Sequence, residues 1–172
     1  MLRFQAMLRG LALIQPRRAT QPMRHTSPPF RVRSSTIHGL GLFAARSLRA
    51  RTRLGTYAGR RMTAAEVESS TWDSRLTYLF GLSDGTVIDG AQGGNHLRHL
   101  IINHSCNPNC EAVERWGGEG RLQLDIVVLR DVLPHEELCI DYSLSIDDAH
   151  AVEAYPCACG APDCRGTMAS QV

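Results

Sequence analysis

Three cysteines near the C-terminus constrain the fold of this chain more than any other feature. They form the pattern Cys157-x-Cys159-x4-Cys164, with a glycine and a proline turning the chain between the thiols. A closed structural zinc site takes four ligands, usually thiolates or imidazoles, so a fourth ligand must come from an earlier segment. The remaining thiols are Cys106, Cys110 and Cys139. If Cys106 completes the site, the metal fixes the tail against the middle of the chain.

A disulfide framework is the alternative for these six cysteines. Thiols separated by one residue do not pair easily, and nothing marks the chain as secreted. The metal interpretation is therefore favoured.

The stretch Asn103–Cys110 gathers two thiols, one imidazole and three carboxamides within eight residues. It follows an apolar run that ends at Ile102, and Pro108 biases the residue before it away from the helical region. A polar segment placed directly after an apolar run is typical of a functional site. The alternative is an ordinary Asn/Pro turn that happens to carry cysteines.

Alternating apolar residues and glycine-rich turns predict about seven short strands and few helices, hence a mostly β domain. Thr63-Ala-Ala-Glu66 is a capping box that predicts a short helix ending near Ser70. The strands are expected at 30–33, 54–59, 76–82, 86–89, 111–115, 122–129 and 138–142, and His38–Ala44 is expected to be a Gly-x-Gly turn that runs into an apolar strand.

The charge of the chain is divided between its two parts. Before Glu66 there are 13 arginines and no acid; from Glu66 onward 6 arginines face 17 acids, and there is no lysine anywhere. An acidic body suits a cationic substrate, and a basic arm could contact nucleic acid. Arginine-rich, lysine-free composition could also reflect the genome.

Residues 1–29 are rich in arginine and proline and show no sustained period, so we expect a disordered arm. The arm could be an organelle-targeting peptide or an extension upstream of a start at Met23. No stretch is apolar enough to span a membrane; the best candidate, Leu8–Ile14, is short and contains Arg9.

Seven motifs, in family order over residues 30–167, make the chain resemble the SET-domain protein lysine methyltransferases with a zinc-binding post-SET tail. The compact layout resembles the small bacterial members. The motifs are His38-Gly-Leu-Gly41, Tyr57-Ala-Gly59, Thr77-Tyr78-Leu-Phe80, Val87-Ile-Asp89, Asn103-His-Ser-Cys-x-Pro-Asn109, Glu136-Glu-Leu-x-x-Asp-Tyr142 and the tail cysteines.

The resemblance implies a SET fold of short strands in small sheets, in which the Asn103-His104 and Asp141-Tyr142 segments cross in a knot-like arrangement. It divides the chain into the arm, a SET domain over 30–145 and a tail over 146–172. It implies S-adenosylmethionine as methyl donor and one structural zinc ion. The implied roles are as follows: catalytic Tyr142, with Tyr57 lining the lysine channel; cofactor-binding His38, Gly39, Leu40, Gly41, Tyr78, Asn103, His104 and Tyr155; zinc ligands Cys106, Cys157, Cys159 and Cys164.

The implied reaction is methyl transfer to a lysine amine of a basic protein or peptide, drawn in by acids such as Glu136, Glu137 and Asp141. We expect a monomer, with no membrane contact, in the bacterial cytoplasm; organelle targeting or delivery to a host cell are alternatives. A catalytically inactive SET-fold module that binds basic peptides is the second functional hypothesis. The third hypothesis is a zinc-dependent nucleic-acid binder that uses the arm. It is ranked last, because the arm lacks interleaved aromatic residues.

The chain departs from the family pattern at three places. The segment Gly94–Ile102 before Asn103 is two residues longer than usual or lacks an Arg-Phe pair. His135 stands where the family has glycine, and Arg60 where it often has an acid. The first departure favours the binding-module hypothesis; an intact Tyr142 favours the enzyme.

Overall fold

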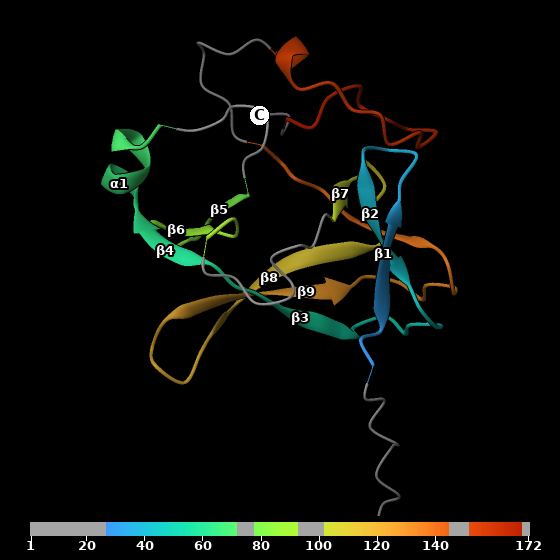
Figure 1. Ribbon diagram of the computed structural model, residues 1–172, viewed down its shortest axis with the longest axis horizontal. Helices are drawn as coiled ribbons and strands as arrows, with labels where there is room; N and C mark the ends of the chain where they lie inside the picture. The colour runs from blue at the N-terminus through green and yellow to red at the C-terminus, as the bar shows by residue number, and fades with distance from the viewer. Residues whose placement is uncertain (1–26, 72–77, 93–101, 145–151, 170–172) are drawn as a thin grey trace, which may run out of the picture.

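The computed structural model describes residues 27–71, 78–92, 102–144 and 152–169. Ten short strands form three small sheets, with a single α-helix and one 3-10 turn among these residues (Figure 1). The mostly β fold expected from the sequence is confirmed. None of the described helices is long and apolar enough to cross a membrane.

The first sheet has the order β1-β2-β10-β7 and contains Leu40, Gly41, Asn103 and His104 of the predicted site residues. Strands β1, β2 and β10 pair antiparallel, whereas β10 and β7 pair in parallel. Its strands are β1 (Phe30–Ser34), β2 (Leu40–Ala44), β10 (Glu137–Ile140) and β7 (Asn103–His104).

The second sheet, β3-β9-β8, packs beside the first. In β9 the residues Leu122, Leu124, Ile126 and Val128 are buried, as their alternation predicted, and they form cores with apolar residues of the other sheets. The strands are β3 (Arg53–Tyr57), β9 (Leu122–Val128) and β8 (Cys110–Trp116).

The third sheet, β4-β6-β5, lies near the only described α-helix. The hairpin expected around Ser83-Asp84-Gly85 is present, since the Leu82 N–H donates to the Thr86 carbonyl. Helix α1 (Ala64–Ser69) begins with the full capping box of Thr63 and Glu66. The strands are β4 (Arg60–Thr63), β5 (Leu79–Gly81) and β6 (Thr86–Asp89).

Two strands were missed: β4, which continues almost directly from β3, and β7, whose two residues are too few to show alternation. Of the proposed disordered arm, residues 1–26 lie outside the described part. The Pro29 carbonyl accepts a hydrogen bond from the Ala45 N–H, so the end of the arm is attached to the first sheet.

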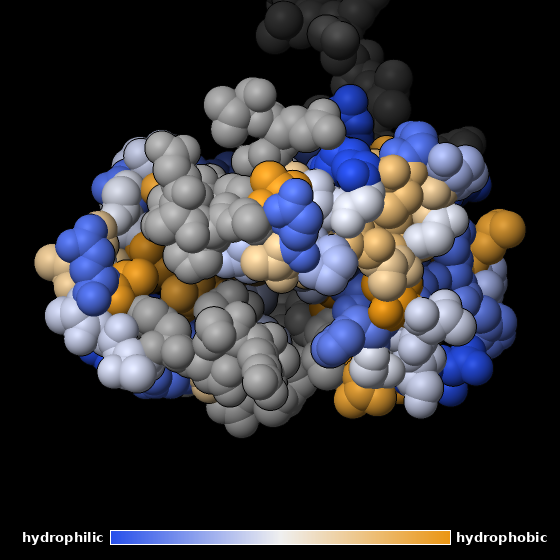
Figure 2. Space-filling model, turned by 90° about the horizontal axis from the view of Figure 1, so that it is seen from above, coloured by the Kyte–Doolittle hydropathy of each residue, from blue (hydrophilic) through white to orange (hydrophobic). Residues whose placement is uncertain are grey.

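The tail returns to the body through main-chain contacts. After the 3-10 turn η1 (Val152–Ala154), Ala169 bridges Leu144 and the Leu144 N–H donates to the Met168 carbonyl. On the face seen in Figure 2, hydrophilic and hydrophobic side chains are interspersed over the described part of the surface.

Candidate active site and cysteine cluster

The site is organised around the parallel pair β7 and β10. Asn103 lies opposite Cys139 and His104 opposite Ile140, and the Ser105 N–H donates to the Ile140 carbonyl. Leu138 and Ile140 are buried in the core, which fixes the strand and directs its C-terminal end toward His104. The structure thus places Tyr142 beside the Asn103-His104 segment, as the resemblance implied.

Tyr142 is held at three points. Its N–H donates to His104 Nδ1 at 3.1 Å, its hydroxyl donates to the Ile102 carbonyl at 2.7 Å, and its ring lies 5.4 Å from the imidazole. Burial, and after it the charge interaction with Cys139, raises the pKa of the Tyr142 phenol to about 12. At neutral pH the phenol is therefore protonated and is a hydrogen-bonding group rather than a base.

Asn103 ties the Gly-x-Gly loop to the same strand pair. Its Nδ2 lies 3.3 Å from the His38 carbonyl oxygen, 3.1 Å from that of Leu40 and 2.8 Å from Glu137 Oε1. Glu137 also accepts from Ser35 Oγ at 3.0 Å. The sequence did not reveal this role of Glu137, because its two partners, Asn103 and Ser35, come from two different segments far from it in the sequence.

Both glycines of this loop have a structural reason. Gly39 has a φ of +47°, a conformation that L side chains adopt at a cost. At Gly41 a Cβ would lie 2.1 Å from Glu137 Oε1. The loop carbonyls and the carboxylate can therefore approach Asn103 only because these positions lack side chains.

Tyr57 and Tyr78 form a second group next to this one. Tyr57 is 3% exposed, its hydroxyl donates to the Tyr78 carbonyl at 2.9 Å, and its ring packs edge-on against Phe80 at 4.7 Å. Burial, followed by the charges of Asp89, Tyr78 and Tyr142, raises the pKa of the Tyr57 phenol above its ordinary value. The tyrosines are thus neighbours, while the channel role of Tyr57 and the cofactor role of Tyr78 stay predictions.

His104 uses both ring nitrogens inside the protein. Nδ1 receives the Tyr142 N–H, and Nε2 lies 3.4 Å from Cys106 Sγ. Burial lowers the pKa of the imidazole, whose side chain is 2% exposed. Since both ring nitrogens already have partners, only the main chain or the ring carbons of His104 remain for the predicted contact with a cofactor.

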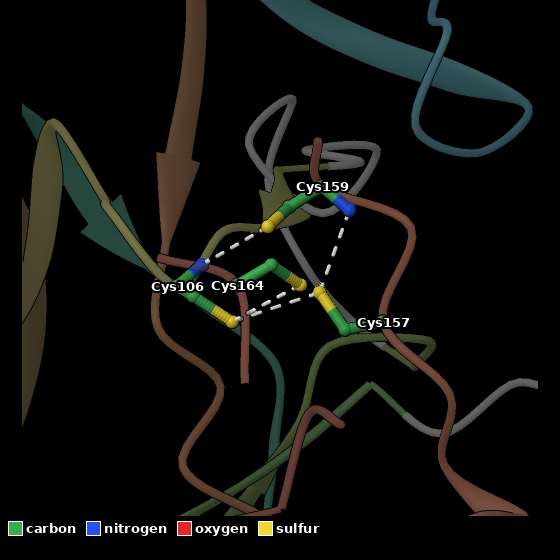
Figure 3. A group of neighbouring side chains, drawn as sticks. All are labelled: Cys106, Cys157, Cys159 and Cys164. Carbon is green, nitrogen blue, oxygen red and sulfur yellow. Dashed lines mark hydrogen bonds between the residues drawn. The ribbon is translucent and has the colours of Figure 1, made fainter. Parts of the chain in front are cut away.

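Four cysteines come together as the sequence suggested, and Cys106 is the thiol that joins the tail cysteines (Figure 3). All four sulfurs lie within 4.8 Å of one another; Cys106 Sγ is 3.7 Å from that of Cys157 and 3.9 Å from that of Cys164. Four sulfurs around a zinc ion with bonds of about 2.3 Å would be about 3.8 Å apart. The cluster could hold zinc.

Main-chain N–H groups surround these sulfurs. The Cys106 N–H points to Cys159 Sγ at 3.5 Å, and the Arg165 N–H to Cys106 Sγ at 3.3 Å. Burial disfavours the Cys159 thiolate, but the hydrogen bonds from the main chain of Cys106 and Ala161 outweigh it and hold its pKa at about 6. Donors aimed at sulfur favour the thiolate, the form that binds a metal, at Cys159, whereas burial raises the pKa of the Cys106 and Cys157 thiols.

The other two thiols are not part of the cluster. Cys110 and Cys139 are buried in the strands, and burial raises the pKa of each to about 12. Both therefore remain thiols inside the body, and the alternatives left open for the fourth ligand are resolved in favour of Cys106.

The expectation that Glu136 and Asp141 attract a basic peptide stays a prediction, and each of these carboxylates already pairs with an arginine of the protein itself. Arg130 lies 2.7 Å from Glu136 Oε1, and Arg165 donates to both oxygens of Asp141, at 2.6 and 2.8 Å. Glu137 is engaged as well, although its partners are the neutral Asn103 and Ser35.

The remaining predicted positions are less informative. The Tyr155 carbonyl accepts from the main chain of Met168, which places its backbone in the folded tail; its proposed contact with adenine stays a prediction. His135 has a φ of +70°, which explains why glycine suits this place in the family. Arg60 forms an exposed ion pair with Glu66, and the altered segment 94–101 lies outside the described residues.

Comparison with known proteins agrees with this geometry. A family model described as "SET domain" matches residues 39–143. The chain is 39% identical over 141 residues to "Histone-lysine N-methyltransferase trr" of Drosophila melanogaster, a match that covers 78% of this chain and 6% of that protein. It is 36% identical over 140 residues to "Histone-lysine N-methyltransferase, H3 lysine-4 specific" of Saccharomyces cerevisiae, covering 78% of this chain and 12% of that protein.

A third relative, "Histone-lysine N-methyltransferase, H3 lysine-4 specific" of Neurospora crassa, is 32% identical over 151 residues, 85% of this chain and 11% of that protein. The chain thus spans only a small part of these relatives, all of them eukaryotic, and its expected bacterial affiliation stays a prediction. The family model covers most of the strands and both halves of the Tyr142 site, from Gly39 to Ser143. By this match and these identities, the chain belongs to the SET-domain family.

Proposed function

We propose that this chain is a protein-lysine N-methyltransferase that uses S-adenosylmethionine. The observation that carries the proposal is the position of Tyr142, whose neutral phenol is fixed beside β7, the strand that also secures the His38–Leu40 loop through Asn103. A catalytic phenol and a loop for the methyl donor are thereby supported by the same strand pair. The names of the relatives describe the same activity.

The phenol can position the amine but cannot deprotonate it. A lysine with an ordinary pKa of about 10.4 must lose its proton before its nitrogen can attack. The Tyr142 hydroxyl proton points to the Ile102 carbonyl, so the oxygen lone pairs are left to accept an amine N–H. Buried aromatic neighbours such as Tyr57 disfavour the ammonium form by desolvation.

The contribution of the protein is then mainly orientation. S-adenosylmethionine, when bound, supplies a methyl group on a positively charged sulfur. Alignment of the amine with that methyl can lower the barrier by roughly 7–11 kcal/mol in well-oriented reactions. We assign the binding of S-adenosylmethionine to His38, Gly39, Leu40, Gly41, Tyr78, Asn103, His104 and Tyr155.

We also propose that Cys106, Cys157, Cys159 and Cys164 bind one structural zinc ion. The spacing of the sulfurs and the absence of an open ligand position in a four-thiolate set support a structural rather than a catalytic metal. The metal would hold the tail against the Asn103–Cys110 stretch.

The substrate is proposed to be a lysine in another protein, for which a histone tail is the first candidate. Two of the relatives carry "H3 lysine-4 specific" in their names. This sequence contains no lysine, so it offers no side-chain amine of its own to methylate.

The test is methyl transfer from labelled S-adenosylmethionine to histone H3 and to an H3 peptide whose target lysine is replaced by arginine. Wild-type protein should label H3 but not the control peptide. Tyr142→Phe removes the hydroxyl and should lower kcat at least about tenfold, since a hydrogen bond made in the transition state is lost. Binding of donor and peptide without any transfer would support the inactive-module hypothesis instead.

A further inference from the structure

His104 connects the cysteine cluster to the catalytic tyrosine. The Tyr142 main-chain N–H is always a donor, so Nδ1, 3.1 Å away, must be the acceptor and carries no proton. The proton of the neutral ring is then on Nε2, which donates to Cys106 Sγ at 3.4 Å. Because the ring is almost completely buried, these two bonds fix its orientation.

Arg165 makes a second connection between the same two places. Its main-chain N–H donates to Cys106 Sγ at 3.3 Å, and its guanidinium binds both carboxylate oxygens of Asp141. Asp141 directly precedes Tyr142, and Arg165 directly follows the cluster residue Cys164. Two paths therefore run from the Cys106 sulfur to the end of β10, and they meet at Asp141, whose Oδ1 lies 3.5 Å from His104 Nδ1.

We propose that His104 and Arg165 are positioning residues that couple the cysteine cluster to Tyr142. The inference rests on the proposed function and adds a second role for the tail, which would set the place of the catalytic phenol. When a metal holds the four thiolates, the Cys106 sulfur is a fixed acceptor for both N–H groups. Loss of the metal frees that sulfur, and the end of β10 loses two supports at once.

The His104 path is tested with two substitutions that each keep one of its bonds. His104→Asn offers an oxygen near the place of Nδ1, and His104→Gln offers an amide N–H near that of Nε2. After zinc loading, release to a chelator should be about 10-fold or more faster for His104→Asn than for His104→Gln, as expected for loss of a bond to a ligand. His104→Gln should show the lower kcat of the two.

The Arg165 path is tested with a double-mutant cycle. Arg165→Met and Asp141→Asn should each reduce kcat about tenfold while the KM for S-adenosylmethionine changes less than about threefold. The double variant should be no worse than the poorer single variant, because both remove one interaction. Arg49→Met is the control: it removes an exposed ion pair with Asp131 and should leave kcat and the KM for S-adenosylmethionine unchanged.

A readout independent of turnover follows the Tyr142 amide by nuclear magnetic resonance. Its proton resonance should move when zinc is removed from the wild type, and move less in the Arg165→Met/His104→Gln protein, which has already lost this coupling. Equal zinc release from both His104 variants, additive effects in the cycle, or an unmoved amide would overturn the inference. A wild type that transfers no methyl group would overturn the proposed function, while zinc release and the amide shift would still decide the coupling.

Discussion

Replacing Gly41 by alanine would place a methyl group where the Glu137 carboxylate lies. The new Cβ would be 2.1 Å from Oε1 and 2.8 Å from the carboxyl carbon, so the carboxylate must move. It would then lose its hydrogen bonds to Asn103 Nδ2 and Ser35 Oγ. Gly41 has no positive φ, so the effect arises from this clash rather than from backbone strain.

The expected magnitude follows from those two bonds. A hydrogen bond to a charged group contributes about 1.5–3 kcal/mol, and Glu137 is only half-buried, so water compensates in part. We expect the free energy of unfolding to fall by about 3 kcal/mol, which corresponds to a Tm lower by roughly 6–12 °C. If half of that loss is felt by the loop that Asn103 secures, the Kd for S-adenosylmethionine rises about tenfold.

Thermal unfolding and calorimetric titration with S-adenosylmethionine measure both effects. Gly81→Ala is the matched control, because Gly81 also lies in a strand and a Cβ there would meet no atom within 4 Å. A Gly41→Ala protein with the Tm and Kd of the Gly81→Ala control would refute the assigned contact between Glu137, Asn103 and the loop.

Three further predictions concern other parts of the molecule. Cys159→Ser should bind less than one equivalent of zinc by metal analysis and lose binding of S-adenosylmethionine, and full activity without zinc would contradict the structural site. Asp125→Asn should destabilise the protein at pH 7 by about 2 kcal/mol in urea unfolding: burial opposes the Asp125 charge, but Arg53, Thr56 and Arg115 hold its pKa at about 2. Because that pKa is lowered in the folded state, the stabilisation is fully present above an ordinary carboxyl pKa of about 3.9 and is lost as the pH falls toward 2. If wild type and Asp125→Asn still differed as much in their free energy of unfolding at pH 2, this explanation would be refuted. Gly90→Ala would put a Cβ 2.0 Å from the buried Tyr57 hydroxyl and should lower the Tm by several degrees, whereas Gly118→Ala meets nothing and should not.

Local chemistry explains why much of the fold could be predicted from the sequence. The alternation in 122–128 determined which face of β9 is buried, and Thr63 with Glu66 determined where α1 begins. The three tail cysteines required a fourth ligand. These features depend on neighbours within a few residues, and such information is present in the chain itself.

The roles of the polar side chains were decided only by the tertiary structure. Asp141 and Glu136, expected to attract a substrate, pair with arginines that lie far away in the sequence or across a turn. Glu137 secures Asn103, and Asp125 is buried between two arginines, although neither position differs in sequence from an exposed strand acid.

The same holds for backbone conformation and for pairing. His135 looks like a peripheral substitution until its φ of +70° shows why glycine suits that position. The two-residue strand β7 has no periodicity, and it exists only because β10 pairs with it in parallel. The sequence by itself determined most of the strands, the helix cap and the three tail cysteines of the cluster. The tertiary structure decided which cysteine joins those three and which charge faces which partner, because both depend on contacts between segments that the chain brings together only on folding.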